Sequence, residues 1–357
     1  AGRHPLDAMI QAWVLVLLAV LPLMISPLAN FAFEGTKALL LHVFAMFGGL
    51  LLFSGWLRDL YSQRGHAPND KPTAASKDAA SRWMLPVAAL VVAIQGVATH
   101  FAVQQDYALH GTPGRGGGLW TYLSLLVLCA GVWRTARTRG GRQRVLEALA
   151  LGSLAPAWMG IMQHFGVDPL DLGGPTHGDR VAGTFGNPIF LGGTLAIMIP
   201  LTLGLAWEHF GAGRRQRGIW SVLVLLSQVA ALWFTGSRGP LGALAGALLL
   251  TLPAGLLVRG HRRPAGVLAG LGLLAIAAAL VGFHLLVVRP FQSDADGRAR
   301  RGRHRFLSVR SVLVRLNIYE AIADTMTDSS PLRRCDRPEA VDPWAPLRPW
   351  IGFGPQN

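Results

Sequence analysis

The feature that most constrains this chain is the long distance between its charged residues. Nine stretches carry no charge, or only Glu147 near the start of one of them, and most reach the roughly 20 residues with which an α-helix crosses a bilayer. These stretches are 8–33, 38–57, 83–105, 116–133, 145–167, 181–207, 218–237, 239–258 and 264–288. Charged residues make up 15% of the 357 residues, whereas soluble domains carry about 25%. The sequence therefore argues against a soluble enzyme and predicts an all-α protein, a polytopic bundle of about nine transmembrane helices over residues 1–288.

The basic residues alternate between crowded and nearly empty connections. Sixteen Lys and Arg lie in four connections, at 58–82, 134–144, 214–217 and 259–263. The four intervening connections carry one basic residue each, namely Lys37, Arg115, Arg180 and Arg238. Because short loops rich in Lys and Arg stay on the cytoplasmic side of a membrane, the pattern predicts a cytoplasmic N-terminus and places the four single basic residues outside.

Residues 289–357 follow the ninth predicted helix and carry twelve arginines. Helix parity places this segment outside, and a loop longer than about 60 residues escapes the positive-inside rule. Apolar residues at helical spacing, Phe306, Val309, Leu313 and Leu316, predict an amphipathic helix on the outer membrane surface. The Arg-rich run 298–305 fits a solvated linker or a lipid-headgroup anchor better than a polyanion site.

Motifs typical of soluble enzymes are missing from the sequence. It has no GxxxxGK[ST] phosphate loop, no HExxH and no paired CxxC. Asp294-Ala295-Asp296 has the shape of a metal-binding DxD motif, but carboxylates in a Gly/Arg-rich linker are more often solvated. The predicted helices hold few ionisable residues, which disfavours an ion-coupled transporter. We therefore expect no metal, no cofactor and no nucleic-acid partner.

Three of the single outer arginines are flanked by small residues, in Gly114-Arg115-Gly116, Arg180-Val181-Ala182-Gly183 and Ser237-Arg238-Gly239. Arginine stays charged, and its planar fork of donors matches phosphate oxygens. Several such forks at the headgroup level could bind a diphosphate together. The simpler alternative is that each arginine contacts phospholipid headgroups.

Several segments from about residue 85 onward resemble the O-antigen ligase family, which includes O-antigen polymerases and related oligosaccharyl transferases. The resemblance is strongest in Arg180-Val-Ala-Gly-Thr-Phe-Gly-Asn187-Pro188 and in Thr235-Gly-Ser-Arg238-Gly239. His110-Gly-Thr-Pro-Gly-Arg115 is similar to the family's first external loop. Arg315-Leu-Asn-Ile-Tyr319 and Gly352-Phe-Gly354 are similar to the ends of its large periplasmic loop.

The resemblance implies an enzyme of the bacterial inner membrane, with its active face in the periplasm. It would transfer a glycan, with inversion and without a metal, from an undecaprenyl-diphosphate carrier to an acceptor hydroxyl. On this reading Arg180 and Arg238 bind the diphosphate, with Arg315 and Arg115 as further candidates. Asn187 and Pro188 are expected to shape the start of the following helix, as cap and first residue, and Gly239 belongs to the second motif.

The sequence leaves the acceptor and the catalytic base open. The acceptor could be a glycolipid, a growing glycan or a protein, and a non-catalytic carrier or flippase for the same lipid is the competing class. The family's proposed base is a periplasmic His that follows the GxG element, and this chain ends at Asn357 before such a position. We therefore expect the chain to be a fragment of a longer protein, with 289–357 as the start of a large periplasmic loop, and we assign no catalytic residue.

Overall fold

The computed structural model describes residues 4–26, 33–64, 79–102, 104–112, 116–168 and 180–258, and short pieces at 260, 263–264, 266–272 and 274. Every regular element in this part of the chain is a helix, as expected for an all-α protein. The α-helices are α1 (Pro5–Val20), α2 (Glu34–Arg64), α3 (Ala79–His100), α4 (Gln105–His110), α5 (Leu119–Ala136), α6 (Arg139–His164), α7 (Pro188–Gly211), α8 (Arg215–Phe234) and α9 (Arg238–Val258). Two short 3₁₀ helices, η1 (Leu21–Leu23) and η2 (Gly183–Phe185), precede α2 and α7.

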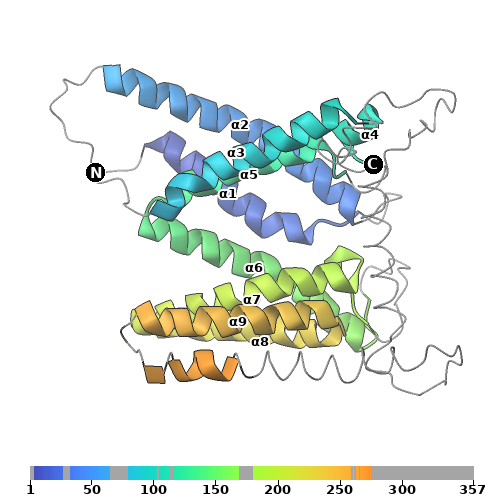
Figure 1. The fold of residues 1–357 in the computed structure, drawn as a ribbon, viewed down its shortest axis with the longest axis vertical. Helices are drawn as coiled ribbons and strands as arrows, with labels where there is room; N and C mark the ends of the chain where they lie inside the picture. The colour runs from blue at the N-terminus through green and yellow to red at the C-terminus, as the bar shows by residue number, and fades with distance from the viewer. Residues whose placement is uncertain are drawn as a thin grey trace, which may run out of the picture. The chain divides into compact units, whose positions relative to one another are not determined.

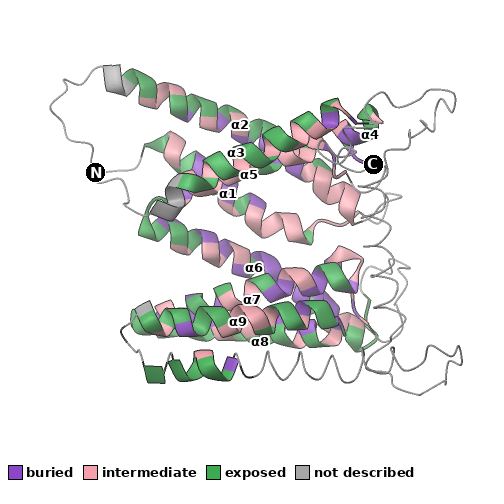
Figure 2. Ribbon diagram, in the orientation of Figure 1, coloured by how far each residue is buried: buried purple, intermediate pink, exposed green. Residues whose placement is uncertain are grey.

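Eight of the nine described α-helices, all except α4, are long and apolar enough to cross a membrane. They correspond to eight of the nine predicted spans, and of the ninth only residues 264, 266–272 and 274 are described, all of them helical. Large apolar side chains lie exposed along α2 and α3 (Figure 2), for example Leu50, which is 67% exposed, and Leu90, which is 60% exposed. Such surfaces suit contact with lipid rather than with water. The predicted amphipathic helix, Asp294, Asp296 and everything else after residue 274 lie outside the described residues.

The chain forms two compact units, and the first one includes the described residues up to Leu244. Its first core joins α1, α2, α5 and α6 around Ile10, Trp13, Val14 and Leu17, which recur on one face of α1. The Trp13 ring lies where side chains at Gly48 and Gly131 would be, and its Nε1 donates a hydrogen bond to the Phe44 carbonyl at 2.9 Å. Small residues in α2 and α5 therefore let three helices pack closely.

The second core of this unit joins α6, α7 and α8. Leu191, Leu195 and Leu232 are almost completely buried in it. Gln228 is fully buried as well, and its Nε2 donates to Ser153 Oγ at 2.7 Å and to Thr202 Oγ1 at 3.0 Å. Because these three polar residues come from three different helices, their hydrogen bonds link α6, α7 and α8 inside the apolar core.

Helix ends gather at two opposite ends of the first unit (Figure 1). At the ion-pair end, defined by Asp7, Arg58, Asp59 and Arg134, the start of α1 meets the ends of α2 and α5. Arg58 Nη1 lies 2.9 Å from Asp7 Oδ2, and Arg134 Nη2 lies 3.0 Å from both Asp7 Oδ1 and Asp59 Oδ2. These side chains form one network of four charges, two of each sign, whose net charge is zero.

Three more helices bring polar residues to the ion-pair end. Arg144 near the start of α6 donates to Gln11 Oε1 of α1 at 2.8 Å. The buried His209, in the last turn of α7, lies 3.2 Å from Glu147 Oε1 of α6 and 3.1 Å from Ser221 Oγ of α8. The basic segments 58–64, 134–144 and 214–217 therefore share one end, which the sequence predicts to be cytoplasmic.

Candidate anion site at the motif end

The opposite end, called the motif end, is defined by residues 180–188 and 235–239. Residues 180–187, called the crossing segment, lead into α7 and contain no α-helix. The helix α7 therefore begins at Pro188, later than the charge-free stretch that starts at Val181. Gln163 Oε1, in the last turn of α6, accepts hydrogen bonds from the Ala182 and Gly183 amides at 3.2 and 2.8 Å. The Thr184 hydroxyl donates to the Pro22 carbonyl of η1 at 2.7 Å. Contacts with two other helices thus hold the segment in place.

The residues before α7 show why this sequence turns here. Gly186 has φ of +67°, which favours glycine, and the Phe33 ring lies where a side chain at this position would be. Asn187 Oδ1 then accepts the Ile189 amide hydrogen at 2.8 Å, and Pro188 occupies the first helical turn. The interpretation of Asn187 as helix cap and of Pro188 as first helical residue is confirmed.

Arg180 is half-buried and lies against the second motif. Its Nε donates to the Thr235 carbonyl at 2.8 Å, and its Nη2 donates to Ser237 Oγ at 2.7 Å. Gly236 has φ of +58°, a conformation that favours glycine, and it lies in van der Waals contact distance of the Arg180 stem. Both sequence motifs therefore meet in one set of contacts.

Both hydrogen-bond partners of Arg180 are neutral. A guanidinium has five N–H donors, and the two contacts with Thr235 and Ser237 use two of them. Among the residues that the structure describes, no carboxylate pairs with Arg180. In this part of the chain its charge is oriented but not neutralised, and this arrangement suits the binding of an anion.

The remaining predicted site residues divide into two groups. Arg238 is the first residue of α9, is exposed, and directly follows Ser237, so it belongs to the same end as Arg180. Gly239 is next to it, and a Cβ there would meet no described atom within 4 Å, so no close packing within the described residues explains this glycine. Arg115 and Arg315 lie outside the described residues.

Lys37 makes contacts that the sequence did not predict. Its Nζ donates to the carbonyls of Thr184, Met24 and Phe33, at 2.6, 2.9 and 3.4 Å. Three acceptors match the three hydrogens of an ammonium group, so Lys37 ties the start of α2 to the crossing segment. A single outer lysine was visible in the sequence, but its partner Thr184 is 147 residues away.

His164 is the second residue that the structure adds to the motif end. It ends α6, next to Gln163, and its ring stacks on the Phe234 ring with centroids 3.7 Å apart and planes at 5°. Phe234 also accepts the Val181 amide hydrogen through its carbonyl, at 3.4 Å. The structure therefore places this exposed imidazole beside the crossing segment.

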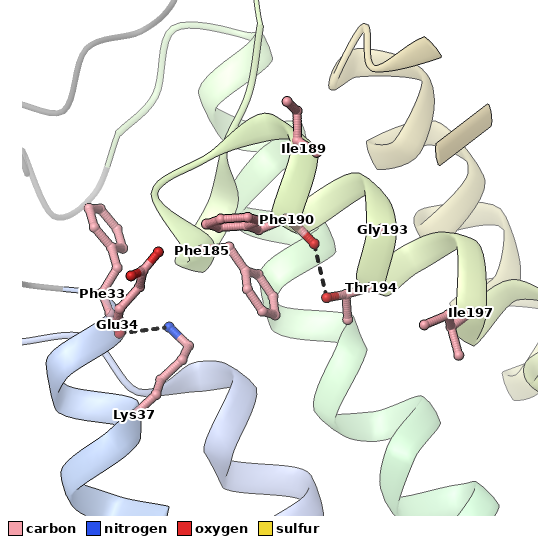
Figure 3. Close-up of a pocket in the computed structure, with 9 residues that line it drawn as sticks. All are labelled: Phe33, Glu34, Lys37, Phe185, Ile189, Phe190, Gly193, Thr194 and Ile197. Atoms are coloured by element: carbon pink, nitrogen blue, oxygen red, sulfur yellow. Dashed lines mark hydrogen bonds between the residues drawn. The ribbon is translucent and has the colours of Figure 1, made fainter. Parts of the chain in front are cut away.

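An open apolar cavity of about 420 Å³ lies between the start of α2 and the first half of α7 (Figure 3). Glu34, Lys37 and Phe185 line one side of it, and Ile189, Gly193 and Ile197 follow one another along α7 on the other. The Thr194 hydroxyl donates to the Phe190 carbonyl at 3.0 Å, so its polar group is satisfied within α7.

The comparisons with known proteins give no match: no family model, no curated protein and no solved structure is significantly similar to this chain. The resemblance to the O-antigen ligase family therefore rests on the motifs alone. What the site can do has to be inferred from its own geometry together with that resemblance.

Proposed function

We propose that the motif end binds the diphosphate of a lipid-linked glycan and that the protein transfers this glycan to an acceptor hydroxyl. The observation that carries the proposal is the setting of Arg180. Its guanidinium is fixed by Thr235 and Ser237, and no described carboxylate neutralises its charge. A fixed cation with donors to spare is a preorganised site for phosphate oxygens.

A membrane-bound phosphate is a better match than a soluble one because of where Arg180 lies. The segment that carries it connects the ends of helices long enough to span a membrane, and these ends are expected at the headgroup level. Arg238 adds a second guanidinium at the start of α9, where the helix dipole also favours negative charge. Two cations at the same end of the helices suit a diphosphate better than a single phosphate.

The proposed reaction is a displacement at the anomeric carbon of the sugar attached to the diphosphate. The acceptor oxygen forms a bond to this carbon, the bond from the carbon to the diphosphate oxygen breaks, and the electron pair stays on the diphosphate. A single displacement inverts the anomeric centre. Arg180 and Arg238 would stabilise the negative charge that grows on the leaving diphosphate. The proton of the acceptor hydroxyl goes to a base that we do not assign.

The glycan, the undecaprenyl carrier and the location in a bacterial inner membrane with a periplasmic active face come from the motif resemblance. They are consistent with the distribution of basic residues, because the motif end carries few of them and the ion-pair end carries many. An O-antigen ligase, a polysaccharide polymerase and a protein oligosaccharyltransferase would use the same diphosphate site with different acceptors.

The test is glycan transfer by the purified full-length protein in proteoliposomes. We expect a glycan supplied on a polyprenyl diphosphate to become covalently joined to an acceptor. Arg180→Ala and Arg238→Ala should each abolish this product while expression persists. The matched control is Arg139→Ala, because Arg139 is an 82% exposed arginine at the ion-pair end. Transfer by Arg180→Ala at the wild-type rate would refute the diphosphate site, and movement of the lipid across the membrane without a covalent product would indicate a carrier.

A further inference from the structure

Three aromatic rings gather at the motif end, where α6 and α8 both end. The His164 ring stacks on the Phe234 ring, with centroids 3.7 Å apart and planes at 5°. The Phe165 ring stands nearly perpendicular to both, at 76° to His164 and 78° to Phe234, with centroids 5.3 and 6.2 Å away. We call these three residues the aromatic corner.

The three rings differ in burial. Phe234 is half-buried and packs against the second core, so it anchors the corner. His164 is exposed, and Phe165 is 71% exposed. In the described part of the chain His164 makes only ring contacts, and neither of its imidazole nitrogens has a hydrogen-bond partner. The corner therefore presents an aromatic surface and one group able to form hydrogen bonds.

Backbone and side-chain contacts join the corner to the residue that carries the anion site. The consecutive carbonyls of Phe234 and Thr235 accept the Val181 amide hydrogen at 3.4 Å and the Arg180 Nε hydrogen at 2.8 Å. Gln163, which directly precedes the corner in α6, accepts the amide hydrogens of the two residues after Val181, at 3.2 and 2.8 Å. Both helix ends that form the corner are thus hydrogen-bonded to the crossing segment.

The chemistry of this surface suits a sugar ring. Aromatic faces carry negative charge, and one face of a pyranose ring is lined by C–H groups with a slight positive charge, so the two surfaces stack. A neutral imidazole has one donor and one acceptor nitrogen, which match the hydroxyls at the ring edge. The exposed Asp168 lies three residues after Phe165, and a carboxylate there favours hydroxyl groups over further phosphate oxygens.

From these contacts we propose that the aromatic corner binds the sugar that is bonded directly to the diphosphate. This assignment rests on the proposed function, because a diphosphate held by Arg180 brings the first sugar next to the helix ends that bind the crossing segment. Phe165 stacks against the C–H face of the sugar, and His164 binds its hydroxyls. The corner then fixes the orientation of the anomeric carbon at which the acceptor attacks.

The test measures the binding of two probes to the full-length protein in nanodiscs by calorimetric titration. One probe is farnesyl diphosphate, and the other is farnesyl diphosphate that carries a single glucose residue. Phe165→Leu keeps a large apolar side chain and removes the aromatic face. We expect it to raise the dissociation constant of the glucosylated probe about three- to tenfold, the contribution typical of an aromatic contact, and to leave that of farnesyl diphosphate unchanged.

Two further variants at this position and elsewhere serve as controls. Phe165→Trp keeps an aromatic face and should bind both probes like wild type. Phe210→Leu changes a 46% exposed phenylalanine in the last turn of α7, at the ion-pair end, and should affect neither probe. Equal weakening of both probes by Phe165→Leu would show that this ring anchors the protein in the membrane surface, and it would overturn the assignment.

His164→Phe separates the imidazole nitrogens from the ring. It keeps an aromatic ring over Phe234 and removes both nitrogens, so the glucosylated probe should bind about fivefold more weakly, as expected for the loss of one hydrogen bond. Farnesyl diphosphate should bind as before. Unchanged binding of the glucosylated probe by both His164→Phe and Phe165→Leu would contradict a sugar site at the aromatic corner.

Arg180→Ala distinguishes failure of the anion site from failure of the sugar site. If this variant binds both probes like wild type, the anion site and the proposed function fall together. If it weakens both probes while Phe165→Leu and His164→Phe weaken neither, the anion site stands and only the sugar site is wrong.

Discussion

At the ion-pair end, Arg58 and Arg134 share the carboxylates of Asp7 and Asp59, whereas at the motif end Arg180 is held by a carbonyl and a hydroxyl. Both settings orient a guanidinium between helix ends through hydrogen bonds of 2.7 to 3.2 Å. They differ in charge, since the first network is neutral and the second keeps a positive charge within the described residues. The partners of an arginine, rather than its presence, therefore separate a structural ion pair from a binding site.

The most direct way to break this difference is to give Arg180 a carboxylate partner. Ser237 is 3% exposed and its Oγ lies 2.7 Å from Arg180 Nη2, so Ser237→Asp would create an ion pair there. We expect kcat/KM for glycan transfer to fall by about 10²–10³, as when an essential donor to a developing charge is lost.

The control for this variant is Ser237→Ala, which removes one hydrogen bond and leaves the Arg180 charge available. Its transfer rate should fall by less than about tenfold, because a typical hydrogen bond contributes about 1 kcal/mol. Equal activities of the Asp and Ala variants would contradict the view that the unneutralised charge of Arg180 matters.

The opposite change is to remove a carboxylate from the ion-pair end. Asp7→Asn leaves Arg58 and Arg134 with Asp59 as their only remaining carboxylate within that network. We expect the free energy of unfolding to fall by about 1.5–3 kcal/mol, the contribution typical of hydrogen bonds to charged groups, measured by thermal unfolding of the purified protein. Transfer by the folded fraction should stay near wild type, and a selective loss of transfer would show that this end has more than a structural role.

Arg180→Lys keeps the positive charge at this position and removes the planar fork of donors. A lysine cannot donate to Thr235, Ser237 and a phosphate with the same planar geometry. We therefore expect transfer about tenfold below wild type and clearly above that of Arg180→Ala, measured as initial rates in proteoliposomes. Full activity of the lysine variant would mean that charge alone is sufficient.

The smallest expected effect comes from the Asn187 helix cap, which supports the motif end. Asn187→Ala removes the side-chain cap of α7 and should lower the free energy of unfolding by about 1 kcal/mol, whereas Asn187→Ser should retain most of it. Hydrogen exchange of the first-turn amides of α7 should show the difference. Unchanged exchange in the alanine variant would indicate that the contacts of the crossing segment are sufficient without the cap.

The sequence predicted those parts of the structure that depend on local signals. The distance between charges located eight spans because a helix of about 20 apolar residues is specified along the chain itself. Asn187 was predicted as a helix cap because capping involves neighbours within three residues. The start of α7 was less clear, since no charge marks the turn at Gly186.

The contacts that build the site were not predictable because they join distant segments. Lys37 and Thr184 are 147 residues apart, and Arg180 and Thr235 are 55 apart. The two motifs could be recognised separately, but their hydrogen bonds to each other depend on the packing of α6, α7 and α8. The stacking of His164 on Phe234 likewise appears only when the helices are placed side by side.

Binding of a diphosphate by Arg180 can be tested without catalysis. Calorimetric titration of the purified full-length protein with a short-chain prenyl diphosphate measures the anion site directly. We expect Arg180→Ala to raise the dissociation constant by more than about tenfold, because charge-assisted hydrogen bonds contribute about 1.5–3 kcal/mol. Arg139→Ala should leave the dissociation constant unchanged. Equal dissociation constants for wild type, Arg180→Ala and Arg139→Ala would contradict the assignment of Arg180 as a diphosphate ligand.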